Sequence, residues 1–250
     1  MVDIDKNKFM SQSTDIYQTG YAHMNKIMEH SRLKLSLKLI QIISGKRKNI
    51  KILDAGCGDG IFTKAIGKTC HSQQLYGYDI SQKAVKMAKK IGVNATAIKA
   101  SQSTLPYHKD YFDLIFCGSI LEIVSDPDQL LQELHRILKR NGYLVITTPN
   151  LNSWASRLVM LFGFLPFYYR VSKEYDIGKI NSHDQKTKSS GFIRLFNLYA
   201  FKKLLILNKF KIIDVYGSPE NAWPKPISWI DRMFSLVPSL AFQLIIVAKK

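Results

Sequence analysis

A run of alternating glycines is the stretch of this chain best suited to hold a ligand. The apolar residues Ile52 and Leu53 lead into Asp54, and Gly56, Gly58 and Gly60 then alternate with small or polar residues. Apolar residues at helical spacing follow at once, a pattern typical of a buried strand, a tight turn and a helix start. Because glycine has no Cβ, a ligand can lie directly on the backbone, where the first N–H groups of the helix also point.

Asp79 is the second candidate, because it ends the next predicted strand, residues 74–79. A carboxylate at the carboxyl end of that strand, beside the glycine turn, can accept hydrogen bonds from both hydroxyls of a ribose. The alternative role is a capping residue for the helix predicted from Ser81 to Lys90. The spacing from the glycine turn favours the ribose.

The glycine spacing separates two ligand classes. A dinucleotide site needs G-x-G-x-x-G, whose third glycine would fall at Ile61. The observed D-x-G-x-G-x-G resembles the first motif of class I methyltransferases that use S-adenosylmethionine; the alternative is a strand–helix connection without a ligand. The resemblance implies S-adenosylmethionine as cofactor, with contacts from the turn and the second strand: Asp54, Gly56, Cys57, Gly58, Gly60, Asp79 and Ile80.

Two later segments resemble the type 11 branch of that family. Residues 101–107 and 111–117 are similar to its D-A-x-x-L-P-F and F-D-x-V segments, with Ser101 in place of the aspartate. The resemblance implies that Ser101 or Gln102 accepts a hydrogen bond from the adenine amino group. It also implies that Cys117 and Gly118, at the end of the fourth strand, lie near the methyl donor.

The next residues, 120–124, resemble the V-L-E-H-V of ubiquinone-pathway O-methyltransferases. Ile123 replaces the histidine and Ser119 an acidic residue that some members carry, so a divalent metal would lose ligands and we predict no metal site. Glu122 either lines the pocket or lies on a helix surface. The [DN]-P-P-[FYW] sequence of nucleobase N-methyltransferases does not follow the fourth strand.

The resemblance implies an α/β fold: a three-layer α/β/α, Rossmann-like domain with a seven-stranded, mostly parallel sheet in the order 3-2-1-4-5-7-6. We assign residues 1–45 to a leader and helix, and 46–250 to the methyltransferase domain, with a helical and loop insertion at about 151–195. A helix is predicted over 21–44, although the leucines from Leu33 to Leu39 alternate as in a strand. Another helix is predicted from Asp126 and Pro127 to Gly142.

Two aromatic segments interrupt the fold, at residues 151–169 and 223–234, and basic residues such as Arg157, Arg170 and Lys173 flank the first of them. They suit a membrane interface or an apolar substrate, and equally a lid helix that packs on its own domain. His183, in a polar stretch, is a weak candidate for a general base, so the catalytic base stays unassigned.

Charge and composition limit the classes of partner that the chain could have. The 250 residues carry 36 Lys and Arg against 19 Asp and Glu, a net charge of +17 that favours a nucleic acid or an anionic membrane, or else a solvated lysine-rich surface. Three cysteines without a C-x-x-C pair, no N-terminal signal pattern and no apolar run of about 18 residues predict a cytoplasmic chain, with peripheral membrane contact as an option.

The sequence therefore predicts an S-adenosylmethionine-dependent methyltransferase that modifies an oxygen of a small or lipid-like acceptor. Two alternatives stay open: an RNA or tRNA methyltransferase, and a non-catalytic scaffold that binds the cofactor. The acceptor and the oligomeric state are not predicted.

Overall fold

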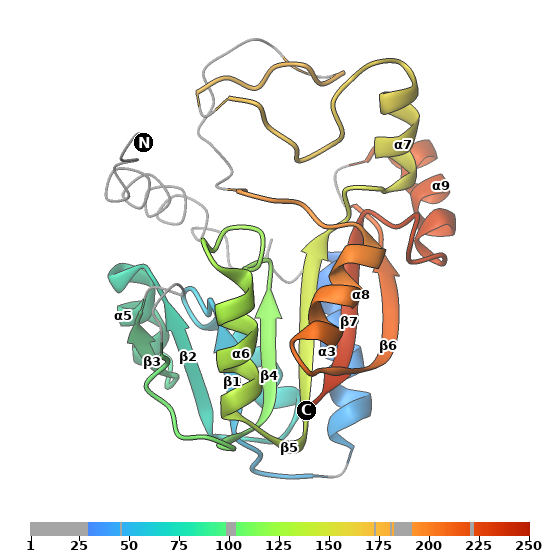
Figure 1. Ribbon diagram of the computed structural model, residues 1–250. Coiled ribbons are helices and arrows are strands. Elements are labelled where there is room, and N and C mark those ends of the chain that lie inside the picture. The colour runs from blue at the N-terminus through green and yellow to red at the C-terminus, as the bar shows by residue number, and fades with distance from the viewer. Residues whose placement is uncertain are drawn as a thin grey trace.

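The fold is built on one sheet of seven strands. The computed structural model describes residues 30–45, 47–98, 104–172, 174–180, 182, 192–220 and 223–250. The strands are β1 (Ile52–Ala55), β2 (Leu75–Asp79), β3 (Asn94–Ala97), β4 (Phe112–Gly118), β5 (Leu138–Pro149), β6 (Lys211–Ser218) and β7 (Gln243–Lys249). Their order is β3-β2-β1-β4-β5-β7-β6, and β7 runs antiparallel between β5 and β6 (Figure 1). The predicted sheet is confirmed.

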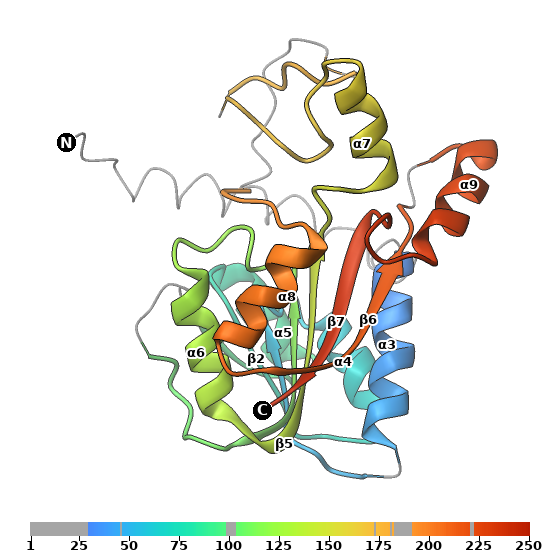
Figure 2. The ribbon, with the colours of Figure 1, turned by 45° about the vertical axis from the view of Figure 1, so that its right-hand side comes forward.

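Helices cover both faces of this sheet. They are α3 (Ser31–Ser44), α4 (Ile61–Thr69), α5 (Gln82–Lys90), α6 (Pro127–Ile137), α7 (Trp154–Leu161), α8 (Leu198–Leu207) and α9 (Lys225–Ser235). One apolar cluster joins α6 and α8 to the sheet, and the other joins α3, α4 and α5 to the opposite face (Figure 2). The central strand β1 is buried along its whole length, as expected for a parallel strand covered on both faces.

The segment with alternating leucines is helical. Leu33, Leu39 and Ile40 are buried, while Leu35 and Leu37 pack at the edge of the same cluster. A helix therefore uses all of these apolar side chains against one layer, which outweighs the strand-like alternation. The part of the predicted helix before residue 30 lies outside the described residues.

The end of α6 differs from the prediction. Asp126 accepts a hydrogen bond from the N–H of Gln129 at 2.9 Å, which confirms the predicted start, but the helix ends at Ile137 rather than at Gly142. Leu138 instead begins β5, opposite Phe112. The ammonium group of the C-terminal Lys250 stabilises this early end, since it donates to the Leu138 carbonyl at 2.8 Å.

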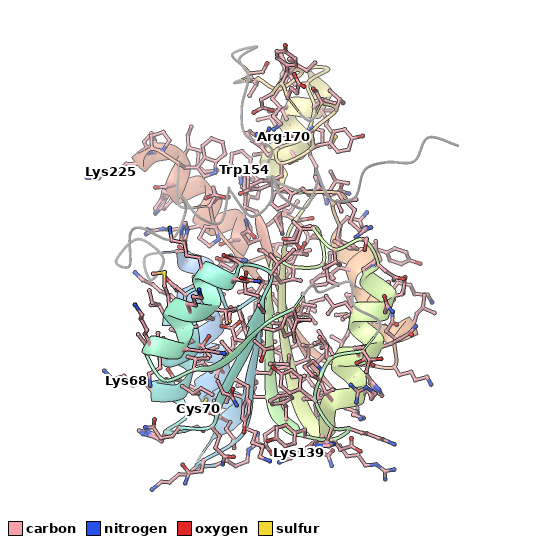
Figure 3. All side chains as sticks on the ribbon, turned by 90° about the vertical axis from the view of Figure 1, so that its left-hand side faces the viewer. Lys68, Cys70, Lys139, Trp154, Arg170 and Lys225 are labelled. Carbon is pink, nitrogen blue, oxygen red and sulfur yellow. The ribbon has the colours of Figure 1, made fainter. Side chains whose placement is uncertain are left out.

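The insertion after β5 and the segment around α9 form a layer at the carboxyl edge of the sheet (Figures 1 and 2). Trp154 joins them: its Nε1 donates to Asp231 Oδ1 at 2.7 Å, and its ring stacks on Phe234 at 5.2 Å. Figure 3 shows Trp154, Arg170 and Lys225 at the same end of the molecule, opposite Lys139. Within the described ranges, no helix is both long and apolar enough to span a membrane.

The packing of α8 makes a direct prediction about stability. Phe201 is fully buried under the sheet, whereas Tyr199 on the same helix is 78% exposed. We expect Phe201→Ala to lower the free energy of unfolding by about 3–5 kcal/mol, because it leaves a cavity. Tyr199→Ala, the matched control, should change it by no more than about 0.5 kcal/mol. Urea unfolding followed by circular dichroism measures both; similar losses would contradict the assigned helix face.

Candidate functional site

The glycine turn after β1 has the left-handed backbone that its composition predicts. The φ angles are 78° at Gly56, 54° at Gly58 and 81° at Gly60, all in the region that favours glycine. The N–H groups of Gly56 and Cys57 donate to the Tyr78 carbonyl at 2.8 and 2.9 Å. The turn is thereby attached to the end of β2, the strand that carries Asp79.

Asp79 is bound to the same turn. Its Oδ2 accepts from the N–H of Gly58 at 3.0 Å, and its Oδ1 accepts from the N–H of Ser81 at 2.9 Å. Burial raises the pKa of this carboxyl, and the backbone N–H groups of Ser81, Gly58 and Ile80 oppose that rise. Ser81, rather than Asp79, is the N-cap of α5. Each carboxylate oxygen of Asp79 retains capacity for a second donor, which suits the two hydroxyls of a ribose.

Two further carboxyl groups flank the turn. Asp54 is buried and accepts a hydrogen bond from the Thr63 hydroxyl at 2.6 Å. Asp59 accepts from the N–H of Ile61 through Oδ1, while its buried Oδ2 has no hydrogen-bond partner among the residues described. An unpaired buried oxygen beside a glycine turn suits a ligand that brings an amino group. The residues present thus fit a nucleoside with an amino-acid tail.

The other predicted cofactor residues differ in how accessible they are to a ligand. The Cys57 side chain packs against Gly77, where an added Cβ would lie 2.6 Å from its Sγ, so that only its main chain is available to the turn. Cys117 is buried in β4, and Gly118 ends that strand. Ile80, directly after Asp79, is partly exposed. Ser101 and Gln102 lie outside the described residues, so the predicted adenine contact stays a prediction.

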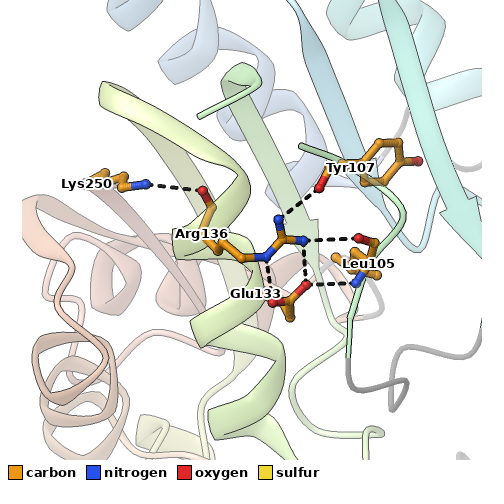
Figure 4. Close-up of polar contacts among 5 residues, drawn as sticks. All are labelled: Leu105, Tyr107, Glu133, Arg136 and Lys250. Carbon is orange, nitrogen blue, oxygen red and sulfur yellow. Dashed lines mark hydrogen bonds and ion pairs between the residues drawn. The ribbon is translucent and has the colours of Figure 1, made fainter. Parts of the chain in front are cut away.

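A polar cluster on α6 holds the loop that follows residues 101 and 102. The guanidinium of Arg136 donates to the carbonyls of Tyr107 and Leu105 at 2.9 and 3.0 Å, and it pairs with Glu133 at 2.8 Å (Figure 4). Glu133 in turn accepts from the N–H of Leu105 at 2.8 Å. We did not predict this cluster. The only signal in the sequence is an oppositely charged pair three residues apart on a helix.

A cavity of about 220 Å³ opens beside the carboxyl ends of β4 and β5. Its wall combines α3, the insertion and the ends of β4, β5, β6 and β7, and includes Arg32, Ser119, Pro149, Tyr168, Glu220 and Gln243. Because Ser119 directly follows Gly118, the cavity adjoins the expected position of the methyl donor. The sequence did not indicate Arg32, a single arginine at the start of a leucine-rich helix.

Glu122 and the metal prediction concern the same region. Glu122 is fully buried, so the helix-surface alternative is wrong. Among the described residues, no three His, Cys, Asp or Glu side chains are grouped so that they could hold a metal ion. His183 lies outside the described residues.

The buried Asp54 makes stability depend on pH. Burial raises its pKa from 3.8 to about 7, the Thr63 hydrogen bond opposes this rise, and the charges of Asp79 and Asp59 add to it. The folded chain therefore binds this proton more tightly than the unfolded chain, and the associated stability is lost as pH rises from about 4 to about 7. We expect Asp54→Asn to reduce the loss by at least about 1 kcal/mol in urea titrations from pH 5 to pH 8. Asp126→Asn is the control. If the free energy of unfolding changed with pH equally in both variants, the effect assigned to the buried Asp54 would be contradicted.

Comparison with known proteins gives a consistent result. Residues 53–146 match the family model described as Methyltransferase domain, of type 11. A ubiquinone biosynthesis O-methyltransferase of Bordetella avium is 26% identical over 129 residues, which cover 49% of this chain and 52% of that protein. A demethylmenaquinone methyltransferase of Staphylococcus aureus is 28% identical, over 58% of this chain and 63% of that protein. The matched part thus spans about half to two thirds of these relatives.

The fold comparison covers more of the chain. An S-adenosylmethionine-dependent methyltransferase from Mesorhizobium loti has a similar structure, with a TM-score of 0.58 and 18% sequence identity, over 85% of this chain and 96% of that one. At this identity the likeness concerns the fold. Together with the family match of residues 53–146, which includes the glycine turn, Asp79 and β4, it supports a class I S-adenosylmethionine-dependent methyltransferase of the type 11 branch.

Proposed function

We propose that this protein transfers a methyl group from S-adenosylmethionine to a hydroxyl of a small or lipid-like acceptor. The observation that carries the proposal is the position of Asp79, which is tied to Gly58 beside a turn of three glycines with positive φ. When bound, the cofactor would supply an activated methyl group on a sulfonium. Asp79 would hold its ribose, Asp59 its amino group and the glycine turn its amino-acid tail.

The adjoining cavity supports a small acceptor or the head of a larger one. Its volume of about 220 Å³ is below the 300–1,000 Å³ typical of sites for drug-sized ligands. The protein's own part in the reaction would be to orient the acceptor oxygen and exclude water, effects that contribute about 7–11 kcal/mol in well-oriented systems. The ubiquinone biosynthesis O-methyltransferases among the relatives agree with an oxygen acceptor.

Cofactor binding gives the first test of this function. We expect Asp79→Ala to weaken S-adenosylmethionine binding at least tenfold. It removes the carboxylate that accepts hydrogen bonds from the ribose, and a hydrogen bond to a charged group contributes about 1.5–3 kcal/mol. Asp126→Ala is the matched control: it removes a carboxylate that caps α6, far from the turn in sequence, and should leave affinity unchanged. Isothermal titration calorimetry measures both, with circular dichroism to check folding. Unchanged affinity in Asp79→Ala would contradict the proposal that Asp79 binds the ribose.

The acceptor class requires an activity measurement. Tritiated-methyl transfer to separate lipid, small-molecule and RNA extracts should label the small-molecule or lipid fraction. Labelling of RNA alone would favour the rival RNA or tRNA methyltransferase, which the charge of +17 motivates. Cofactor binding without labelling of any fraction would favour the non-catalytic scaffold.

We further propose that the layer above the cavity contacts an anionic membrane surface. Apolar side chains on and next to α7 and α9 are exposed: Leu158, Leu161, Phe162, Trp229, Met233 and Leu236. Lys225 and Arg232 lie on α9 among them. An apolar face with basic residues suits the headgroup region of an anionic bilayer, and its proximity to the cavity would let a lipid-like acceptor enter from the membrane.

Vesicle flotation tests this membrane contact. The double variant Leu161→Ser, Leu236→Ser removes two side chains that are 81% and 83% exposed. We expect it to reduce binding to anionic vesicles at least tenfold, since about 1.5–3 kcal/mol is gained when each such side chain is buried. Leu207→Ser, which alters a 68% exposed leucine at the end of α8, is the control. Wild-type protein that stays unbound, or binds neutral and anionic vesicles equally, would exclude the proposal.

A further inference from the structure

Polar residues from three parts of the chain meet at the end of β4. Arg32, on α3, donates from Nη1 to the hydroxyl of Ser119, and from the same nitrogen to Thr147 Oγ1 at 2.9 Å. Ser119 lines the cavity, and Glu122 is fully buried three residues further along. The cluster thus extends from the cavity wall into the interior.

Ser119 has an uncommon backbone conformation. Its φ is 55°, in the left-handed region that a side chain other than that of glycine rarely adopts. Its N–H donates to the Thr147 carbonyl at 3.0 Å, which helps to hold the residue there. Backbone strain of this kind is concentrated at functional sites, where the surrounding structure maintains it. The strained backbone therefore makes Ser119 a candidate functional residue.

Glu122 has an incompletely satisfied carboxyl group. Its Oε2 accepts from Thr148 Oγ1 at 3.4 Å, while its buried Oε1 has no hydrogen-bond partner within the described part of the chain. Burial raises the pKa of Glu122 to about 7, against the charge of Arg32 and side-chain hydrogen bonds from Ser119 and Thr148, which lower it. A carboxyl group that titrates near neutrality can accept a proton under working conditions.

We propose that Ser119 relays the proton of an acceptor hydroxyl to Glu122, while Arg32 holds Ser119 and stabilises the acceptor oxygen as its charge develops. This inference deepens the function proposed above and rests on it. Ser119 would be the catalytic residue, since it contacts the acceptor, and Glu122 would act through it.

The acceptor O–H bond breaks and its proton moves to Ser119 Oγ, while the original hydroxyl proton of Ser119 moves to Glu122. The acceptor oxygen forms a bond to the methyl carbon as the carbon–sulfur bond breaks, and the electron pair of that bond stays on sulfur. After the products leave, the relay runs in reverse: Glu122 returns its proton to Ser119, which passes a proton to solvent in the emptied cavity.

The surrounding charges indicate which acceptors would suit this site. One positive charge, that of Arg32, is accompanied here by two carboxyl groups. These are the buried Glu122 and, in the cavity wall, Glu220, whose Oε2 accepts from the Tyr168 hydroxyl. Arg194 donates to main-chain carbonyls of the loop that holds Glu122, and the Cys117 thiol lies in β4 nearby. An acceptor that arrives as an anion would be repelled by the two carboxylates. The cavity therefore favours a neutral hydroxyl, such as a phenol, that ionises only in place.

A coloured phenol tests the relay without turnover. The probe is 3-nitrophenol, a weaker acid than 4-nitrophenol, whose absorbance reports its ionisation. It is used in the presence of S-adenosylhomocysteine and at a pH one unit below its pKa in solution, which keeps the Glu122 carboxyl, with its pKa of about 7, largely ionised. We expect the wild-type protein to bind it with the ionised fraction raised at least fivefold, because its proton has moved to Glu122. Ser119→Ala and Glu122→Gln should lose this increase.

Thr148→Val is the matched control, because the hydroxyls of Thr148 and Ser119 both act on the Glu122 carboxyl and lower its pKa, but of the two residues only Ser119 lines the cavity. A supporting role alone would make the two hydroxyl variants equivalent, whereas the relay predicts that Thr148→Val retains ionisation. Equal behaviour of all variants, or no ionisation in the wild type, overturns the proposal. Ser119→Ala and Thr148→Val suffice if Glu122→Gln does not fold. Calorimetry with S-adenosylmethionine separates this failure from a failure of the proposed function.

Discussion

The hydrogen bond from the Gly58 N–H to the Asp79 carboxylate is the contact on which the rest of the site depends. A buried carboxylate requires donors, and this one obtains them from a turn after β1 and from the residue that caps α5. Gly58 can present its N–H in this direction because it tolerates a φ of 54°. The pairing of β1 with β2 brings the ends of the two strands together. The hydrogen bond therefore needs all three features at once: β1 beside β2 in the sheet, a glycine at position 58 and a carboxylate at the end of β2.

Much of the fold could be predicted because its signals are local. The apolar runs, the glycine spacing and the Asp126–Pro127 helix start each lie within a few residues, and the resemblance supplied the strand order. Where the prediction failed, distant residues make contacts that the local sequence does not indicate. At the end of α6, Lys250, which lies 112 residues after Leu138, donates to the Leu138 carbonyl. No periodicity around Gly142 could indicate that contact.

The candidate site shows the same division. The turn and Asp79 were evident from spacing, whereas the cavity wall was not, because it is assembled from α3, the insertion and the ends of four strands. Arg32 and Ser119 are 87 residues apart. In the sequence Arg32 is one of 36 basic residues, and only the packing of α3 against the sheet distinguishes it from the solvated lysines around it.

The cluster at the end of β4 also bears on how one fold can serve different chemistries. Ser119 and Ile123 stand where the O-methyltransferases that this segment resembles carry an acidic residue, in some members, and a histidine, so neither position offers such a group to an external cation. The chain has instead a guanidinium, held on Ser119 and Thr147 by a helix that lies outside the matched family segment. A covalently attached cation does not dissociate, and its charge does not change with pH in the physiological range. In the proposed relay, pH sensitivity would therefore reside in Glu122 rather than in Arg32, and the selectivity for neutral acceptors would follow from the carboxyl groups of Glu122 and Glu220 beside the cavity.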